Sequence, residues 1–161
     1  MNQSMQECAS YCKELKLLYV EDNDNARAFT MEMLKRFFNH IEVAKDGVEG
    51  LERYKKSKFD LVLTDINMPN MNGIDMAQEI KIIDDSTIIL MLSAHNETDY
   101  FISSIKLGVD GFLLKPIELT QFIDVLTKVV EKIHLRKEIK NYQLELESSN
   151  IILEKKVKER T

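Results

Sequence analysis

Long apolar runs are missing from this sequence of 161 residues. None approaches the roughly 18 residues of a membrane-spanning helix. The first 13 residues also lack the basic start and apolar stretch of a signal peptide. We therefore expect a protein that stays in the cytoplasm and does not enter a membrane.

The sequence also has no excess of positive charge, because it contains 22 Lys and Arg but 27 Asp and Glu, which gives a net charge of −5. Binding the phosphates of nucleic acid requires clustered Lys and Arg. The composition therefore argues against nucleic acid as a partner. The 44% hydrophobic and 30% charged residues are instead typical of one folded domain with an appendage.

Cysteine is scarce: the sequence contains only Cys8 and Cys12, four residues apart. A structural zinc site would need about four ligands, and no nearby His or Cys completes the set. A disulfide is disfavoured in a reducing compartment. We expect two reduced, partly buried thiols, because free cysteines prefer burial.

Short β-rich runs alternate with helical patterns along most of the chain. Strands are expected at 15–20, 41–44, 60–64, 87–92 and 111–114, and helices at 27–38, 47–54, 74–83, 99–107 and from 119 onward. The first helix carries apolar Phe29, Met33, Leu34 and Phe37 at helical spacing. Five successive βα units indicate a parallel sheet with right-handed crossovers and helices on both faces. The sequence therefore predicts a doubly wound α/β domain.

The last helix is expected to be long, because no Pro or Gly interrupts residues 119–158. In the later part of this helix, apolar residues follow a heptad pattern: Leu135, Ile139, Tyr142, Leu146 and Leu153. The polar residues Ser149 and Lys156 occupy two further positions of the pattern and weaken it. Two interpretations remain, a solvated single helix and a parallel coiled-coil dimer. The dimer is favoured because a lone helix would leave its apolar seam in water.

Chemically active side chains follow four of the expected strands. Glu21 and Asp22 follow the first strand, Asp65 the third, Ser93 the fourth and Lys115 the fifth. In a doubly wound sheet, ligands bind beyond the carboxyl ends of the strands. We therefore expect these five side chains to converge.

Such a set suits phosphoryl transfer. Closely spaced carboxylates repel one another, and Mg²⁺ (or Mn²⁺ in its place) relieves the repulsion while accepting oxygen ligands. A carboxylate can act as the nucleophile and form an acyl phosphate. Lys115 and the Ser93 hydroxyl can each contact a phosphoryl oxygen.

Four runs of the sequence, LYVEDN at 18–23, LTDINMP at 63–69, LSA at 92–94 and LKP at 114–116, resemble the signature of CheY-like response-regulator receiver domains. The resemblance extends over about residues 15–133. It implies a flavodoxin-like sheet with strand order 2-1-3-4-5. It also implies a two-component signalling protein whose partner is a histidine kinase or a phosphotransfer protein.

The resemblance also implies a role for each motif residue. Asp65 would be the phosphoacceptor, and Asp22 with Glu21 would serve Mg²⁺. A backbone carbonyl of Asn67 would complete the metal ligands. Ser93 would be the switch hydroxyl and Lys115 the phosphate-contacting lysine.

Three further positions bear on switching and on the lifetime of the phosphoryl group. Phe112 falls at the switch aromatic of the family, although a plain core residue explains it equally well. Glu21 stands where many members have Asp, which could route metal binding through water. Asn67 and His95 lie where attacking water would pass, so we expect them to tune dephosphorylation.

Competing functions lack a required residue. Phosphatases of the haloacid-dehalogenase type need a second Asp two places after the nucleophile, where this chain has Asn67. A calcium loop starting at Asp22 would need Gly where Arg27 stands. A dinucleotide site would need a Gly-rich loop after the first strand. We therefore expect a switch that catalyses only its own phosphotransfer and dephosphorylation.

Three segments are expected along the chain: a helical extension at 1–14, a receiver domain at 15–134 and a coiled-coil linker at 135–161. In this organisation, phosphorylation acts through the helix at 99–107, the strand at 111–114 and the last helix to control an output domain beyond residue 161. The alternative is a stand-alone receiver that docks on a separate target protein. A homodimer through the last helix or the switch face fits the first interpretation.

Overall fold

A single parallel sheet forms the centre of the protein, in a computed structural model that describes residues 3–94 and 98–160. Its strands run in the order β2-β1-β3-β4-β5. They are β1 (Lys16–Val20), β2 (His40–Ala44), β3 (Leu61–Asp65), β4 (Ile88–Ser93) and β5 (Gly111–Leu114). All pairs are parallel, which confirms the doubly wound α/β fold and the strand order.

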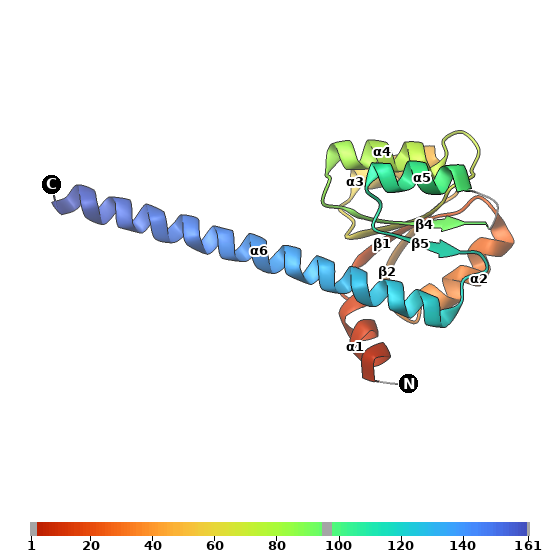
Figure 1. Cartoon of the computed structure of the whole chain (residues 1–161), viewed down its shortest axis with the longest axis horizontal. Coiled ribbons are helices and arrows are strands. Elements are labelled where there is room, and N and C mark those ends of the chain that lie inside the picture. Colours follow the sequence, from red (N-terminus) through yellow and green to blue (C-terminus); the bar gives the residue numbers. More distant parts are fainter. Residues whose placement is uncertain (1–2, 95–97, 161) are drawn as a thin grey trace. The chain divides into compact units, whose positions relative to one another are not determined.

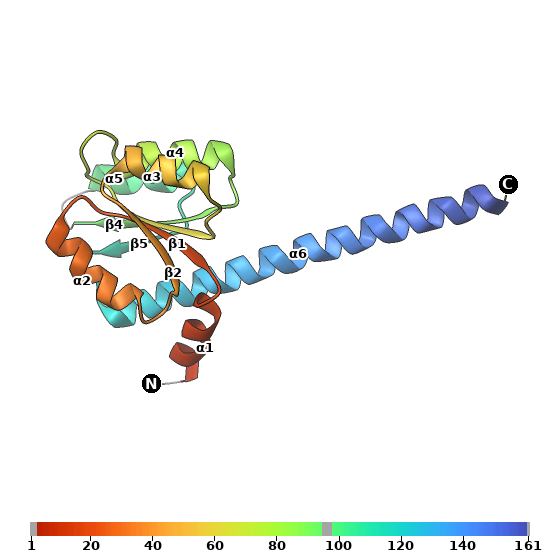
Figure 2. The ribbon, with the colours of Figure 1, turned by 180° about the vertical axis from the view of Figure 1, so that it is seen from behind.

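The helices cover both faces of this sheet, with α3, α4 and α5 on one face and α2 with the first part of α6 on the other (Figures 1 and 2). Their bounds are α1 (Gln3–Cys12), α2 (Asp24–Leu34), α3 (Gly47–Lys56), α4 (Gly73–Ile83), α5 (Thr98–Leu107) and α6 (Leu119–Arg160). Every residue of β3 and β4 is consequently buried. A strand covered on both faces is largely a continuous apolar run, and in these two strands only the terminal Thr64, Asp65 and Ser93 are polar.

The first helix of the α/β domain differs from its predicted range of 27–38. α2 begins at Asp24, because the side chain of Asn23 accepts a hydrogen bond from Ala26 N at 2.9 Å and caps the helix. The buried residues of this helix are Thr30 and Leu34. The prediction that Phe29 belongs to the apolar face was wrong, since that side chain is 65% exposed.

Two aspartates accept hydrogen bonds from the backbone of neighbouring strands at the amino-terminal edge of the sheet. The Asp60 carboxylate accepts a hydrogen bond from Lys16 N, and Asp110 accepts one from Ile89 N, both at 2.9 Å. Lys81 in turn lies 3.7 Å from Asp110. These contacts join neighbouring strands at one end, and so help to bring their opposite, carboxyl ends into line.

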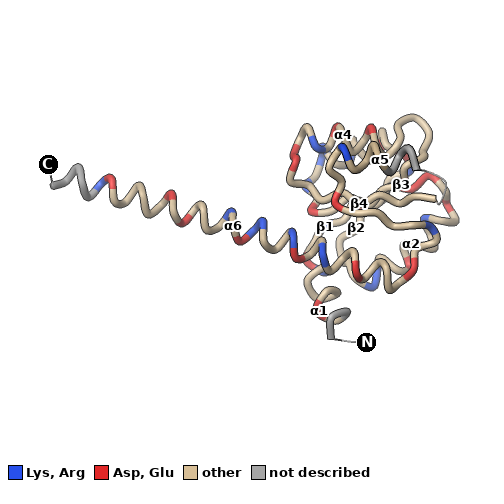
Figure 3. Tube along the Cα trace, viewed as in Figure 1, with Lys and Arg blue, Asp and Glu red and all other residues tan. Residues whose placement is uncertain are grey.

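The chain divides into two compact units, and the boundary falls within α6, after Val130. In the second unit the predicted heptad side chains Leu135, Ile139, Tyr142, Leu146 and Leu153 are all exposed. Acidic and basic residues are interspersed along this part of the helix (Figure 3). Among the described residues, no helix combines the length and apolarity needed to cross a membrane.

Candidate functional site

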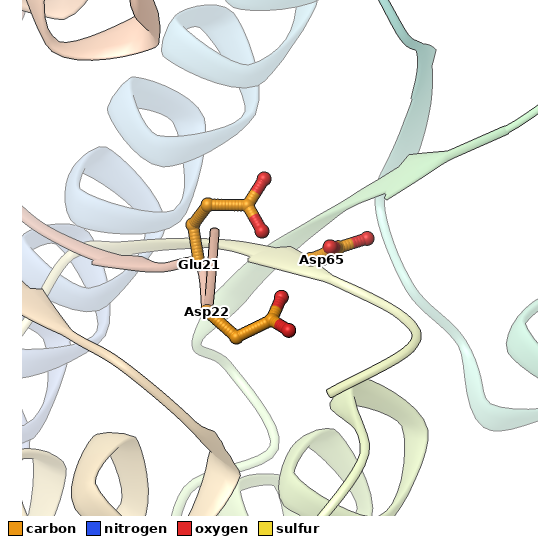
Figure 4. Close-up of side chains that lie close together, drawn as sticks. All are labelled: Glu21, Asp22 and Asp65. Atoms are coloured by element: carbon orange, nitrogen blue, oxygen red, sulfur yellow. The ribbon is translucent and has the colours of Figure 1, made fainter. Parts of the chain in front are cut away.

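Three carboxylates meet at the carboxyl edge of the sheet. Glu21 and Asp22 follow β1, and Asp65 is the last residue of β3. Their side chains face a common space (Figure 4), and one oxygen from each lies within 4.8 Å of the others. Glu21 and Asp65 are buried, whereas Asp22 is exposed. β1 and β3 are adjacent in the sheet, which is why residues 43 positions apart in sequence converge.

Lys115, which follows β5, connects two of these carboxylates. Its Nζ donates to Asp65 Oδ2 at 2.7 Å and to Glu21 Oε1 at 2.8 Å. Burial acts to lower the pKa of Lys115, but the hydrogen bonds to Asp65 and Glu21 outweigh it and raise the pKa. The ammonium therefore stays charged and offsets part of the negative charge.

Asp22 is affected by its position at this edge. Partial loss of solvent around its carboxylate, and then its hydrogen bond with Glu21, raise the pKa of Asp22. The ionised Asp22 carboxylate is therefore held at an energetic cost, which a bound cation would remove. Close carboxylate oxygens with surplus negative charge are the donors that hard divalent cations such as Mg²⁺ prefer. The residues present thus fit such an ion.

Asp65 is held by its own backbone surroundings. Its Oδ1 accepts a hydrogen bond from Ile66 N, and its carbonyl oxygen accepts one from the Thr64 hydroxyl, both at 2.9 Å. The start of α4 packs directly on this segment: Gly73 N donates to the carbonyl of Ile66 at 2.8 Å. A Cβ at Gly73 would collide with the carbonyl oxygen of Asp65. Only glycine fits there without movement.

Arg27 supports the loop that carries the acidic pair. Its Nη1 donates to the carbonyl oxygen of Glu21 at 2.9 Å, and its Nη2 forms an ion pair with Asp24. Neither Arg27 nor Gly73 was predicted to support the site. The signals available in the sequence were Asn23 as a cap, which places Arg27 on the first turn of α2, and a glycine directly before the predicted helix at 74–83.

Two of the other predicted site residues belong to segments that adjoin Asp65, since Leu92 of β4 pairs with Asp65 and Asn67 follows it by two residues. Ser93, the last residue of β4, is buried, and its hydroxyl donates to the carbonyl of Ala94 at 3.0 Å. Asn67 is exposed two residues after Asp65. Phe112 on β5 is partly buried against the hydrophobic core. His95 lies outside the described residues, and the roles of all four stay predictions.

The Lys115→Gln variant should lose stability most strongly when divalent cations are absent. Without the ammonium, Glu21 and Asp65 would be left as unpaired buried carboxylates, an arrangement that typically costs about 3–5 kcal/mol when one partner of a buried pair is removed. Lys115 is partly exposed, so we expect a smaller loss of about 1–2 kcal/mol. Thermal unfolding with and without Mg²⁺ measures this.

The expected pattern is a lower melting temperature without Mg²⁺ and a larger rise on adding it than in the unaltered chain. Lys128→Gln provides the control, because Lys128 is exposed on α6. An identical Mg²⁺ response in both variants would disprove the electrostatic role of Lys115.

Comparison with known proteins places residues 17–140 in the family model described as the response regulator receiver domain. The chain is 32% identical over 124 residues to chemotaxis protein CheY-3 of Vibrio cholerae, covering 75% of this chain and 95% of that protein. It is 29% identical to two-component response regulator ARR10 of Arabidopsis thaliana, covering 88% of this chain and 26% of that protein.

Solved structures show the same fold. The N-terminal domain of an uncharacterized protein from Wolinella succinogenes has a TM-score of 0.69 and 36% identity, covering 76% of this chain and 98% of that one. The adenylate cyclase structure from Rhodopirellula baltica has a TM-score of 0.72 at 22% identity, covering 80% of this chain and 96% of that one.

Proposed function

Because this chain belongs to the response regulator receiver domain family of two-component systems, we propose that Asp65 accepts a phosphoryl group from a histidine kinase or a phosphotransfer protein. The observation that carries the proposal is the position of Asp65, beside two other carboxylates and hydrogen-bonded to Lys115. A buried carboxylate with a neighbouring ammonium and space for a cation is suited to act as a nucleophile toward phosphorus.

In the proposed transfer, a carboxylate oxygen of Asp65 attacks the phosphorus of a phosphohistidine. The new O–P bond forms as the N–P bond of the donor breaks, and the released imidazole takes up a proton. Ile66 N orients one oxygen of Asp65, while Lys115 can move from the carboxylate to a phosphoryl oxygen. Mg²⁺, held by Glu21, Asp22, Asp65 and the Asn67 carbonyl, would supply neutralisation of the phosphoryl charge.

The proposed switch lies beside this site. Phosphorylation adds about −1.5 to −2 charges, and the Ser93 hydroxyl, now donating to Ala94, would turn toward them. Phe112 would then pack further inward and alter the face formed by α5, β5 and α6. Couplings of this kind are typically about 1–3 kcal/mol, enough to shift a population between two conformations.

The lifetime of the phosphoryl group is the proposed role of Asn67 and His95. Both follow strands at the carboxyl edge of the sheet, two residues after Asp65 and Ser93 respectively. We expect the His95→Ala variant to dephosphorylate at a different rate. Phosphate release after removal of the donor measures this, and an unchanged rate would rule out the role of His95.

Phosphorylation itself is tested with the full chain, Mg²⁺ and acetyl phosphate as a small donor. Intact mass spectrometry should show the addition of a single phosphoryl group that hydroxylamine removes, as expected of an acyl phosphate. Omitting Mg²⁺ or adding a chelator should prevent the addition. A chain that stays unmodified with the metal and donor both present would contradict the proposed function.

The second part of α6 is the proposed dimer element. Its heptad side chains are exposed, and burying such a seam against a second copy removes apolar surface from water. Glu131 and Arg136 stand at flanking positions of the pattern where, in a parallel dimer, they would face each other across the seam. A dimer would let phosphorylation change the pairing of the two helices, and so act on an output domain attached to them.

The double variant Ile139→Lys with Leu146→Lys should convert a dimer into a monomer, because it places charges in the centre of the seam. The control is Leu144→Lys with Ile151→Lys, which adds the same two charges on the same helix at exposed positions outside the seam. Light scattering gives the mass of each variant. If the control dissociates as readily as Ile139→Lys with Leu146→Lys, the seam is wrongly assigned.

A stand-alone receiver that docks on another protein is the alternative. CheY-3, in which the matched region makes up 95% of the protein, has little chain beyond the receiver, whereas in ARR10 it makes up 26%. Light scattering with Mg²⁺, before and after adding beryllofluoride as a phosphoryl mimic, separates the two. A monomer in both states would favour docking on a separate target.

A further inference from the structure

Two buried thiols have no part in the proposed phosphoryl transfer. Cys8 and Cys12 lie on α1, ahead of the region that matches the receiver family. Their Sγ atoms are 4.0 Å apart, and the residues are only 4% and 0% exposed. Both are free cysteines. A close pair of nucleophilic sulfurs outside the family region is therefore a candidate for a separate function.

We propose that Cys8 and Cys12 bind a single soft cation of the copper(I) class. Metal–sulfur bonds of about 2.3 Å, the length for zinc, can join sulfurs up to about 4.6 Å apart. The observed 4.0 Å separation lies within that reach, so a cation can bridge the two thiols while α1 keeps its helical backbone.

A disulfide fits the same pair less well. It needs an S–S distance of about 2.05 Å and Cβ atoms about 3.5–4.5 Å apart, whereas residues four apart on a helix have Cβ atoms about 5–6 Å apart. Oxidation would thus distort the last turn of α1. The geometry favours a bridging ion over a covalent bond.

The number of ligands favours copper(I) over zinc. Structural zinc sites take four ligands, but within the described part of the chain no cluster of three or more His, Cys, Asp or Glu includes these cysteines. Thiolates select soft ions such as copper(I), which accepts two sulfur ligands. Two sulfurs alone are therefore a sufficient site for this ion.

The protonation of the pair also suits a cation. The hydrogen bond from Cys12, acting against burial, lowers the pKa of Cys8 to about 7, so a thiolate is available near neutral pH. The same interaction, together with burial, raises the pKa of Cys12. A binding cation would meet the Cys8 thiolate and displace the proton of Cys12 to water.

The position of the pair suggests what the ion would do. α1 lies beside the first part of α6, and Cys8 interacts with the side chain of Thr127 on that helix (Figure 1). A ligand that binds only the folded state stabilises it by mass action. Bound copper(I) would thus hold the last turn of α1 in its helical form against α6.

The test is an anaerobic titration of the full chain with copper(I) against a coloured copper(I) chelator. We expect one ion per chain, and a loss of affinity of at least about 100-fold in Cys8→Ser and in Cys12→Ser, because each removes one of two ligands. Circular dichroism should show that both variants keep the fold. Phosphorylation from acetyl phosphate should be unchanged in them, so this test and the receiver test fail independently.

Three outcomes would overturn the proposal. The chain could retain no copper(I) against the chelator, or both serine variants could bind it as tightly as the unaltered chain. The third outcome is that copper(I) binds only after the chain is unfolded in urea, which would show that the folded pair is closed to the ion.

Discussion

The Asp65→Asn variant should take up no phosphoryl group at all from acetyl phosphate in the presence of Mg²⁺. The amide is nearly the same size as the carboxylate but lacks the anionic oxygen that attacks phosphorus. It also removes one of three carboxylates from the acidic group and one partner of Lys115. Intact mass spectrometry of the variant beside the unaltered chain measures the loss.

Asp75→Asn is the matched control for this experiment. Asp75 is an exposed aspartate in the first turn of α4, outside the acidic group, so its variant should be phosphorylated fully. Modification that persists in Asp65→Asn, on Asp22 for example, would show that the acidic group is reactive but that the acceptor is wrongly assigned.

The second large effect is expected on the stability of the Gly73→Ala variant, which adds a single methyl group. In Gly73→Ala the added Cβ meets the carbonyl oxygen of Asp65, and it lies only 3.1 Å from that carbonyl carbon and 3.2 Å from Ile66 Cα. These are backbone atoms, so the end of β3 or the start of α4 must shift. Overpacking of this kind costs about 1–3 kcal/mol and occasionally more. We expect about 3 kcal/mol, together with slower phosphorylation because Asp65 is displaced.

Gly108→Ala separates this steric effect from the general cost of replacing glycine. Gly108 has a φ of +87° and no atom within 4 Å of an added Cβ, so only the backbone strain of about 1–2 kcal/mol applies. Chemical denaturation gives both free energies of unfolding. We expect Gly108→Ala to keep a normal rate of phosphorylation. Equal losses of stability and activity in the two variants would argue against the close approach at Gly73.

The alternation of β-rich runs with helical patterns was enough to predict the sheet, because its central strands are almost entirely apolar. β3 and β4 are buried at every position, and a strand with helices on both faces is a nearly continuous apolar run. The strand order was harder to predict, since the residues show only that the strands alternate with helices. That order came from the resemblance to receiver domains.

The boundaries of α2 were mispredicted because local chemistry decided them. Asn23 caps the helix through Ala26 N, so the helix begins three residues before the predicted start. Phe29 lies on its exposed face. Phe37 lies beyond the end of α2 but is still buried, with its ring 5.4 Å from that of Phe122. An apolar residue at helical spacing can thus belong to the core without belonging to the helix.

The convergence of the site was predictable, but its internal contacts were not. Parallel strands bring their carboxyl ends to one edge, so the meeting of Glu21, Asp22 and Asp65 follows from topology. The pairing of Lys115 with both Glu21 and Asp65 depends on how far the lysine side chain reaches from β5 toward β1 and β3. Sequence spacing contains no information on such distances.

The charge around the lysine that joins Glu21 to Asp65 predicts an order of events for the proposed transfer. Three carboxylates and one ammonium give the acidic group a formal charge of two minus, which would repel a phosphorylated donor. One divalent cation would cancel that charge. The domain should therefore react with a phosphorylated donor only after a divalent cation has bound.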